Sequence, residues 1–279
     1  MNFDVSHPEV IDAVRRALAE DIGSGDITSA ITIPETAAAR GTFYARQELA
    51  LAGIELLAVI YELRGGVEEL KLLAASGDRC VDGQALATVR GRARTLLECE
   101  RVALNFLQRL SGVATMARRF VDAVAGTRTK ILDTRKTTPG LRRLEKMAAA
   151  AGGVTNHRMG LFDAVLIKNN HITAAGGVRA ALERVRAAGP QVPVEIEVRT
   201  REELDEALAC GAPHLLLDNL TPEEAAGWVR HIAGRATAEL SGGMTLDNVR
   251  RYAESGADYI SCGAITHSVS AAEINFRLE

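Results

Sequence analysis

Cysteine is scarce in this sequence, and long apolar runs are missing. The 279 residues include four cysteines, Cys80, Cys99, Cys210 and Cys262, which lie far apart and form no CxxC pair. This spacing argues against a zinc site and a disulfide framework, and it favours a reducing compartment. No stretch approaches the ~18 uninterrupted apolar residues of a membrane helix, and the polar, acidic start does not resemble a signal peptide. We therefore expect a soluble cytoplasmic protein with no membrane partner.

The chain also lacks an excess of positive charge. Its formal net charge is −3, so no global basic field predicts nucleic acid as a partner. Any anion must instead be bound by a local group of Arg and Lys side chains. Apolar residues make up 47% of the chain and charged residues 25%, which is ordinary for a folded globular protein. The length allows one large domain or two smaller ones.

The first hundred residues predict a small α+β unit. Residues 6–9 read Ser-His-Pro-Glu, a capping-box pattern, and apolar residues at helical spacing follow, so a helix over about 7–20 is expected. Residues 21–34 are rich in Gly, Ser and Thr and are expected to form a loop. Short apolar runs between residues 40 and 94 are separated by turn pairs, which predicts an antiparallel sheet with one helix over 54–63.

A long helical pattern joins this unit to the rest of the chain. Residues 95–125 have a helical period, and Gly112 in their middle predicts a break or kink. We place the domain boundary near this glycine, with an N-terminal domain over 1–110 and a second domain over 111–265.

The second domain shows a regular alternation of strands and helices. Thr138-Pro139 predicts the start of a helix that ends at Gly152, and Thr221-Pro222 predicts the start of another. Six short apolar strands are expected, at 130–134, 164–168, 194–198, 214–218, 237–241 and 258–262. Such alternation indicates a parallel α/β sheet. The short strands and turns favour a barrel, complete or nearly so, over an open doubly wound sheet.

Polar or glycine residues stand near the C-terminal end of all six strands. In a β/α barrel these ends share one face, and that face holds the active site. In chain order the residues are Asp133, Arg135 and Lys136; Lys168; Glu195 and Glu197; Asp218 and Asn219; Ser241, Gly242 and Gly243; and Cys262, Gly263 and Ala264. Their shared placement predicts an anion site, to which Arg158 in the loop before the second strand can contribute.

The residue types suggest separate roles within this site. Arg suits a planar carboxylate through its fork of donors, and Lys suits phosphate as a point charge. Glu195 and Glu197 are two apart on one strand, so they point to the same side. Together with Asp218 they can hold a divalent metal or ribose hydroxyls, and Mg²⁺ favours one or two carboxylates beside substrate phosphates. The glycine-rich ends of the last two strands fit a phosphate group, because glycine lets backbone N–H groups approach closely.

Several of these features also have purely structural readings. A single cation after a strand is usually a solvated loop residue, and Ser-Gly-Gly can be only a tight turn. His171 can serve as a structural hydrogen-bonding residue or as a ligand, and Cys262 is expected to be a small apolar filler. Two carboxylates in the apolar strand over 194–198 are harder to explain without a function, because an unpaired buried carboxylate is costly.

Long stretches of the chain resemble one known family. ERVALNFLQRLSGVAT (100–115), DTRKTTPGLRRLEKMA (133–148), GGVTNHRMGLFDAVLIKNNHI (152–172), VEIEV (194–198), LLLDN (215–219) and ELSGG (239–243) resemble quinolinate phosphoribosyltransferase, also called carboxylating nicotinate-nucleotide pyrophosphorylase. The resemblance covers essentially the whole chain, including EDIGSGDIT (20–28).

The resemblance implies a fold, a reaction and an assembly. The implied fold is an N-terminal α/β sandwich domain and an incomplete, TIM-like α/β barrel, with the tail 266–279 packing back on the first domain. The implied enzyme is a glycosyltransferase that joins quinolinate to phosphoribosyl pyrophosphate with Mg²⁺, giving nicotinate mononucleotide, pyrophosphate and CO₂ for NAD synthesis. The implied assembly is a homodimer or larger oligomer whose active sites are shared between subunits.

The resemblance also implies roles for individual residues. Lys168 is expected between the two substrates, and Glu197 and Asp218 are expected to bind the ribose and the Mg²⁺-bound pyrophosphate, either directly or through the substrate. A catalytic role is expected for these three residues and for Lys136. The quinolinate-binding group is expected to comprise Arg101 of the partner subunit, Thr134, Arg135, Lys136, His157 and Arg158. The 5′-phosphate is expected at Ser241, Gly242, Gly243, Cys262, Gly263 and Ala264.

Three other functions remain to be weighed against this one. A related pyrophosphorylase-like transferase could use a different aromatic acid. A non-catalytic ligand sensor on the same barrel should have lost some of Arg135, Lys168, Glu197 or Asp218, and all four are present. A lyase or aldolase could use Lys168 as a Schiff base, but its sequence neighbours do not predict the apolar pocket that would lower the pKa of such a lysine.

Overall fold

The computed structural model describes residues 3–279, which form two compact units. Unit 1 comprises residues up to Arg118, Thr137–Gly153 and Ile265–Glu279, and unit 2 comprises Arg119–Lys136 and Val154–Ala264. The chain therefore enters unit 1 three times, and the segment 137–153, which the sequence places in the barrel domain, is grouped with unit 1. No helix among the described residues is long and apolar enough to cross a membrane.

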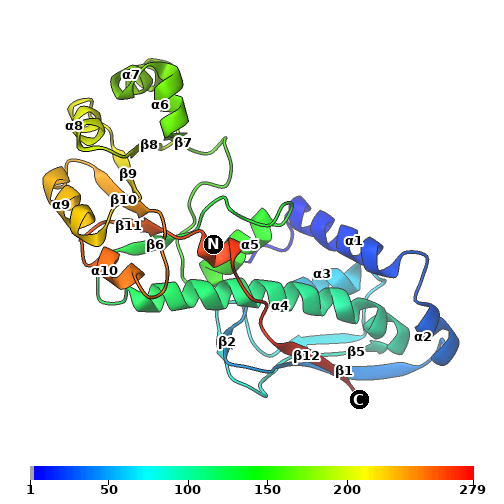
Figure 1. The fold of residues 1–279 in the computed structure, drawn as a ribbon. Helices are drawn as coiled ribbons and strands as arrows, with labels where there is room; N and C mark the ends of the chain where they lie inside the picture. The colour runs from blue at the N-terminus through cyan, green and yellow to red at the C-terminus, as the bar shows by residue number, and fades with distance from the viewer. Residues whose placement is uncertain (1–2) are drawn as a thin grey trace. The chain divides into compact units, whose positions relative to one another are not determined.

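Unit 1 contains the antiparallel sheet that the sequence predicts. Its strand order is β12-β1-β5-β3, and a separate pair joins β2 to β4. The strands are β1 Ala38–Ala45, β2 Leu49–Ala50, β3 Glu69–Leu72, β4 Arg79–Cys80, β5 Ala85–Arg92 and β12 Ile274–Leu278. Figure 1 shows β12, the last strand of the chain, beside β1.

The contact between β12 and β1 depends on a glycine. Gly41 pairs with Leu278 in the β1–β12 ladder, and a Cβ atom at Gly41 would overlap the ring of Phe276. The ring instead packs against Phe43, with 4.6 Å between the ring centroids, and Phe43 is fully buried. The absent side chain at Gly41 thus gives the C-terminal strand its place on the sheet.

The first two helices of unit 1 differ from the sequence prediction. The elements are α1 Pro8–Ile22, α2 Ile27–Thr32, α3 Leu56–Glu62, α4 Ala93–Ala123, α5 Arg142–Ala151 and α11 Ala264–His267, of which α4 and α11 extend into unit 2. The capping box at Ser6 is wrong, because His7 is the N-cap and its Nδ1 accepts from Glu9 N at 3.2 Å. The expected loop over 21–34 contains α2, which Asp26 caps by accepting from Ser29 N.

The predicted break at Gly112 is also wrong, because α4 continues through this residue. A Cβ at Gly112 would overlap the carbonyl oxygen of Ser270 and come 3.0 Å from Val269 Cγ1. The glycine therefore serves the close approach of the C-terminal segment to α4, and this approach outweighs its low helix propensity.

The segment before α5 forms a turn, although the sequence predicts a helix from Pro139. Thr138 donates from its backbone N and its hydroxyl to the Glu145 carboxylate, at 3.0 and 2.7 Å. These bonds hold the Thr138–Leu141 turn, so the helix begins only at Arg142.

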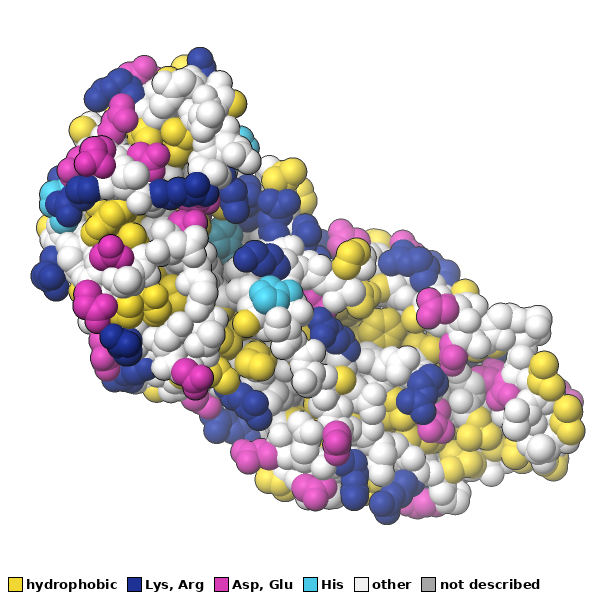
Figure 2. Space-filling model, viewed as in Figure 1, with side chains coloured by type: hydrophobic (Ala, Val, Ile, Leu, Met, Phe, Trp, Pro, Cys, Tyr) yellow, Lys and Arg dark blue, Asp and Glu magenta, His cyan; other side chains and the backbone are white. Residues whose placement is uncertain are grey.

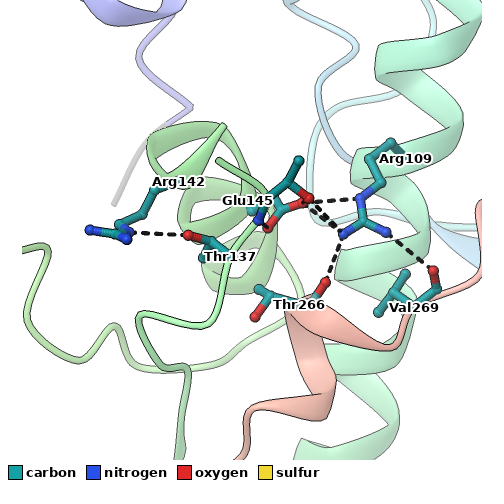
Figure 3. A network of polar contacts seen from close by, with 7 residues as sticks. Arg109, Thr137, Arg142, Glu145, Thr266 and Val269 are labelled. Atoms are coloured by element: carbon teal, nitrogen blue, oxygen red, sulfur yellow. Dashed lines mark hydrogen bonds and ion pairs between the residues drawn. The ribbon is translucent and has the colours of Figure 1, made fainter. Parts of the chain in front are cut away.

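Glu145 is the centre of a polar network in unit 1 (Figure 3). The side chain is 0% exposed and forms an ion pair with Arg109 on α4, whose Nη2 lies 2.7 Å from Oε1. Arg109 also donates to the carbonyl oxygens of Thr266 and Val269, at 2.7 and 3.1 Å. One buried carboxylate and one guanidinium thus join α4, α5 and the segment before β12.

Unit 2 contains the six parallel strands that the sequence predicts. Their order is β6-β11-β10-β9-β8-β7, and no β6–β7 pair closes this sheet within residues 3–279. The strands are β6 Lys130–Leu132, β7 Val165–Ile167, β8 Val194–Val198, β9 His214–Asp218, β10 Thr237–Ser241 and β11 Tyr259–Ser261. An α/β fold with an incomplete barrel is therefore confirmed.

The helices of unit 2 follow the strands in turn. They are α6 Asn169–Ala175, α7 Val178–Ala188, α8 Arg201–Ala209, α9 Pro222–Ile232 and α10 Val249–Ala253, and α8 to α10 lie outside the strands in Figure 1. The helix start predicted at Thr221-Pro222 is confirmed, and Thr221 and Glu224 form a capping box there. The short helix α6 follows β7 directly and precedes α7.

The buried ion pair of unit 1 leads to a stability prediction. Arg109→Met leaves the Glu145 carboxylate buried without its cation, which should lower the free energy of unfolding by about 3–5 kcal/mol. The control Arg15→Met removes an ion pair with Asp12 in which both side chains are more than half exposed, and should cost about 0–1 kcal/mol. Urea unfolding of both variants measures the difference, and equal losses would contradict the role of the network.

Candidate active site

The register of the parallel sheet brings the predicted strand-end residues of unit 2 to one edge. Ile167 pairs with Ile196, so Lys168 follows β7 beside the position of Glu197 on β8. Ser241 at the end of β10 pairs directly with Asp218 at the end of β9. Backbone pairing therefore sets an order of lysine, glutamate, aspartate and serine across four neighbouring strands.

Arg158 is a partly buried cation with an unused donor. Its Nη1 donates to Ala164 O at 3.1 Å, while its Nε is buried and has no hydrogen-bond partner in the described part of the chain. Burial, followed by the charge of Arg135, lowers the pKa of the Arg158 guanidinium. Two neighbouring guanidinium groups repel each other, and an anion with planar acceptors would relieve this repulsion.

Asp133 organises the loop that carries Arg158. This carboxylate, at the end of β6, is fully buried. It accepts hydrogen bonds from His157 N at 2.8 Å and from Asn156 Nδ2 at 2.6 Å. The sequence places Asp133 at the strand end, and the structure shows that it supports the loop backbone.

His157 contacts two acidic side chains, the half-buried Glu195 and the buried Glu239. Its Nε2 is 3.3 Å from Glu195 Oε2 and 3.6 Å from Glu239 Oε2. Its Nδ1 accepts from Arg158 N at 2.7 Å, so both ring nitrogens face protein atoms. The ligand atoms of these three residues lie within 4.8 Å of one another. At least one of Glu195 and Glu197 was expected to be functional, whereas Glu239 is absent from the predicted site.

Glu197 has an internal partner that the sequence analysis missed. The carboxylate is 6% exposed, and its Oε1 accepts from Arg199 Nε and Nη2 at 3.2 and 3.1 Å. Arg199 follows two positions later, just beyond the end of β8. In extended backbone this spacing puts both side chains on the same side, which was the available signal for the pair. A buried carboxylate with a guanidinium partner remains charged at a smaller cost than an isolated one.

The end of β9 has a strained but satisfied conformation. Asn219 has φ of 58°, donates from Nδ2 to Asp218 Oδ2 at 2.8 Å, and donates from its backbone N to Ser241 O at 2.9 Å. Gly242 has φ of 101°, and a Cβ there would overlap Asn219 Oδ1 and lie 2.9 Å from Asn219 N. Glycine is therefore required at this position of the Ser241-Gly242-Gly243 turn.

Two residues have roles more limited than a ligand contact. Burial, followed by the Glu239 charge, raises the pKa of the Cys262 thiol to about 12, and its backbone N donates to Leu132 O, so Cys262 is a neutral, buried filler. His171 Nδ1 accepts from Lys168 N at 2.9 Å at the start of α6, which is a structural role.

The remaining predicted residues have simple environments. Arg135 is half-buried, Lys136 and Lys168 are exposed, and Thr134 Oγ1 accepts from Lys136 N at 3.1 Å. Gly263 and Ala264 are half-buried beyond β11. Arg101 belongs to unit 1, where it is exposed on α4. The expectation that Arg101 acts on the site of a neighbouring subunit stays a prediction.

Comparison with known proteins identifies the family. A family model of the N-terminal domain of quinolinate phosphoribosyl transferase matches residues 26–111, and a model of its C-terminal domain matches residues 113–277. The chain belongs to the quinolinate phosphoribosyltransferase family. The family resemblance inferred from the sequence motifs is thereby confirmed.

Individual relatives agree along the whole chain. The nicotinate-nucleotide pyrophosphorylase [carboxylating] of Mycobacterium leprae is 43% identical over 96% of this chain and 96% of its own length. A probable enzyme of the same name from Bacillus subtilis is 39% identical over 97% of this chain and 94% of its own length. Among solved structures, NadC from Streptococcus pyogenes has a TM-score of 0.94 at 36% identity, covering 100% of this chain and 99% of that one.

The glycine turn beside Asp218 yields a second stability prediction. Gly242→Ala should lower the free energy of unfolding by about 1–3 kcal/mol, because an alanine there is strained at positive φ and overlaps Asn219. Gly227 lies within α9 with open space around it, so the control Gly227→Ala should gain about 0.5–1 kcal/mol. Thermal unfolding of both variants decides the point; a Gly242→Ala protein as stable as wild type would refute the proposed requirement.

Proposed function

We propose that this protein transfers the phosphoribosyl group of phosphoribosyl pyrophosphate to quinolinate with loss of CO₂. The products are nicotinate mononucleotide and pyrophosphate, so the enzyme supplies de novo NAD synthesis. Family membership and the names of the relatives support this reaction. The single observation in the site that carries it is the pair Arg135 and Arg158, a half-buried cationic group in which the Arg158 Nε has no hydrogen-bond partner among the described residues.

The quinolinate part of the site would consist of Arg135, Lys136 and Arg158, with Thr134 beside them. Quinolinate carries two adjacent carboxylates, and bidentate guanidinium groups both neutralise and orient such a ligand. His157 enters this proposal as the support of Arg158, because its ring nitrogens face Glu195, Glu239 and the Arg158 backbone. A direct contact of these nitrogens with quinolinate would require the ring to turn.

The reaction would proceed through an oxocarbenium-like transition state at the ribose. The quinolinate nitrogen forms a bond to the anomeric carbon while the bond from that carbon to the pyrophosphate oxygen breaks. The developing positive charge is stabilised by the carboxylates of Glu197 and Asp218, and Lys168 stands beside Glu197. The bond to the 2-carboxylate then breaks, its electron pair passes to the pyridinium ring, and a proton from solvent replaces CO₂. Positioning and electrostatics supply most of the rate.

The carboxylates near the ribose fit a Mg²⁺ ion that is held mainly by the substrate. Mg²⁺ favours oxygen ligands and commonly keeps one or two carboxylates plus substrate phosphates. Glu197 is already paired with Arg199, whereas Asp218 Oδ2 accepts a hydrogen bond from the neutral side-chain amide of Asn219. We therefore propose that Asp218 faces the Mg²⁺-bound pyrophosphate and that Glu197 binds the ribose. The ion would neutralise the leaving pyrophosphate.

The 5′-phosphate would lie at the glycine-rich strand ends. Ser241, Gly242 and Gly243 follow β10, and Gly263 and Ala264 follow β11, the neighbouring strand in the sheet. Barrel enzymes commonly bind phosphate at such loops. Cys262 is left out of this set, because its backbone N–H is used by Leu132 O. Outside the site, Figure 2 shows basic and acidic side chains interspersed over the outer helices of unit 2, which does not favour nucleic acid as a partner.

The decisive experiment is an assay with quinolinate, phosphoribosyl pyrophosphate and Mg²⁺. Wild-type protein should form nicotinate mononucleotide, Arg135→Ala should raise KM for quinolinate at least about tenfold, and Asp218→Ala should act mainly on phosphoribosyl pyrophosphate. If another aromatic acid is used in place of quinolinate, the alternative of a related pyrophosphorylase-like transferase holds. Unchanged kinetics in both variants would exclude the proposed residue roles.

We further propose a homodimer or larger oligomer in which Arg101 of one subunit reaches the barrel site of its neighbour. Arg101→Ala and Lys168→Ala proteins should each be inactive alone. When the two variants are co-expressed, the preparation should recover about a quarter of wild-type activity. About half of the dimers are then mixed, and each mixed dimer carries one intact shared site. Absence of recovery in a preparation shown by mass spectrometry to contain mixed dimers would overturn the shared site.

A further inference from the structure

The cluster of His157, Glu195 and Glu239 is the feature of unit 2 that the proposed reaction leaves unexplained. Glu239 is 4% exposed, and its Oε1 has no hydrogen-bond partner within residues 3–279. Its other oxygen faces His157 Nε2, and the Ser261 hydroxyl hydrogen-bonds the same carboxyl group. Burying a carboxyl group this deeply is expensive, so a structural accident is a poor explanation.

The ring of His157 transmits this cluster to the loop that carries Arg158. Because Nδ1 accepts a hydrogen bond from Arg158 N, the ring proton lies on Nε2, which then faces the two carboxyl groups. The loop is held from its other side by Asp133. The backbone at residues 157 and 158 is thus fixed between β6 below it and the carboxyl groups of β8 and β10.

We propose that Glu195 and Glu239 are positioning residues for the substrate acid: through the His157 ring they set the backbone at Arg158 and so aim its guanidinium at a quinolinate carboxylate. This inference rests on the proposed function. It adds two residues, neither of which touches the substrate. A group that must bind a planar carboxylate bidentately gains most from such support, because small errors in its placement are costly.

Charge supports the same arrangement. Burial, followed by the Glu195 charge, raises the pKa of Glu239 to about 8, so its protonated form is favoured near neutral pH. The titratable groups facing Glu239 are Glu195 on β8, which also shares a hydrogen bond with it, His157 and the neutral Cys262 thiol. Its partners in the sheet are the apolar Leu216 on β9 and Tyr259 on β11. A neutral Glu239 avoids repulsion with Glu195, which is the nearer of the two acids to His157 Nε2.

The same geometry argues against a metal ion at this cluster. A metal would need the lone pair of Nε2 and would move the ring proton to Nδ1. That proton would then oppose the Arg158 N–H, which now donates to Nδ1 at 2.7 Å. The arrangement therefore fits a hydrogen-bonded support and not a metal site.

Variants at Glu239 distinguish the effect of side-chain length from the effect of acidity on KM for quinolinate. Glu239→Gln keeps the length of the side chain and resembles the protonated acid, so KM for quinolinate should stay within about threefold of wild type. Glu239→Asp keeps an acid but withdraws it from His157, and Glu239→Leu removes its polar atoms. Both should raise KM for quinolinate at least about tenfold while KM for phosphoribosyl pyrophosphate stays within about twofold. Glu195→Leu should behave in the same way.

The exposed Glu183 on α7 provides the control Glu183→Gln, which should leave both KM values unchanged. Calorimetric binding of quinolinate to the folded Asp variant tests the idea even if the Leu variants fail to fold. Unchanged quinolinate binding in the Asp variant would overturn the inference, as would full activity in Asp with loss in Gln, or a Zn²⁺ ion bound by wild type and lost in Glu239→Gln. A wild-type protein that forms no nicotinate mononucleotide would instead refute the proposed function.

A stability measurement follows from the same carboxyl group. Its folded pKa of about 8 lies above the ordinary value of 4.5, so the folded state binds the extra proton between these pH values. The free energy of unfolding of wild type should therefore fall relative to Glu239→Gln as pH rises through this window. A difference between the two proteins that does not change from pH 5 to pH 8 would show that Glu239 is ionised throughout, and the proposed support would be wrong.

Discussion

The hydrogen-bonded register of the parallel sheet is the constraint on which the candidate site depends. Each pair of neighbouring strands in unit 2 is aligned so that the residues at their C-terminal ends meet. The direct pairing of Ser241 with Asp218 is the clearest case. Side chains that lie tens of residues apart in the sequence therefore line one edge without any long-range side-chain contact having to hold them there. Backbone geometry alone therefore sets the positions of the lysine after β7, the glutamate of β8 and the aspartate of β9.

The charges at the candidate site differ in whether they are compensated by a protein partner. The cationic group of Arg135 and Arg158 is self-repelling, and burial adds to the cost of the Arg158 charge. Glu197 and Glu239 have different environments: Glu197 is paired with Arg199, whereas burial raises the pKa of Glu239. Under the proposed function, Arg135 and Arg158 would face the substrate carboxylates. This arrangement suits a substrate with two carboxylates and a separate ribose carrying phosphates.

Sequence patterns predicted the six strands and their order along the chain because apolar runs of five residues between turns admit few other structures. They also predicted Lys168, Glu197 and Asp218 as site residues from their positions at strand ends, and Arg158 from the loop before the second strand. The patterns failed where a local signal competed with a tertiary contact. Gly112 is a helix breaker by propensity, but in the folded chain it serves the close approach of Ser270. Pro139 is a good first helical residue, but Thr138 is held in a turn by Glu145.

The sequence by itself determined the family, the α/β alternation and the types of charged residue at the strand ends, because these depend on neighbours within a few positions. The tertiary structure alone decided which of those charges have partners. Glu239, Glu195 and His157 are separated by about 40 positions or more from one another, and no local pattern joins them. Their contact exists because β8 and β10 direct two side chains toward one loop. The charged residue types at the strand ends could therefore be identified in the sequence, whereas the contact of Glu195 and Glu239 with His157 depends on burial and distance, which only the folded chain defines.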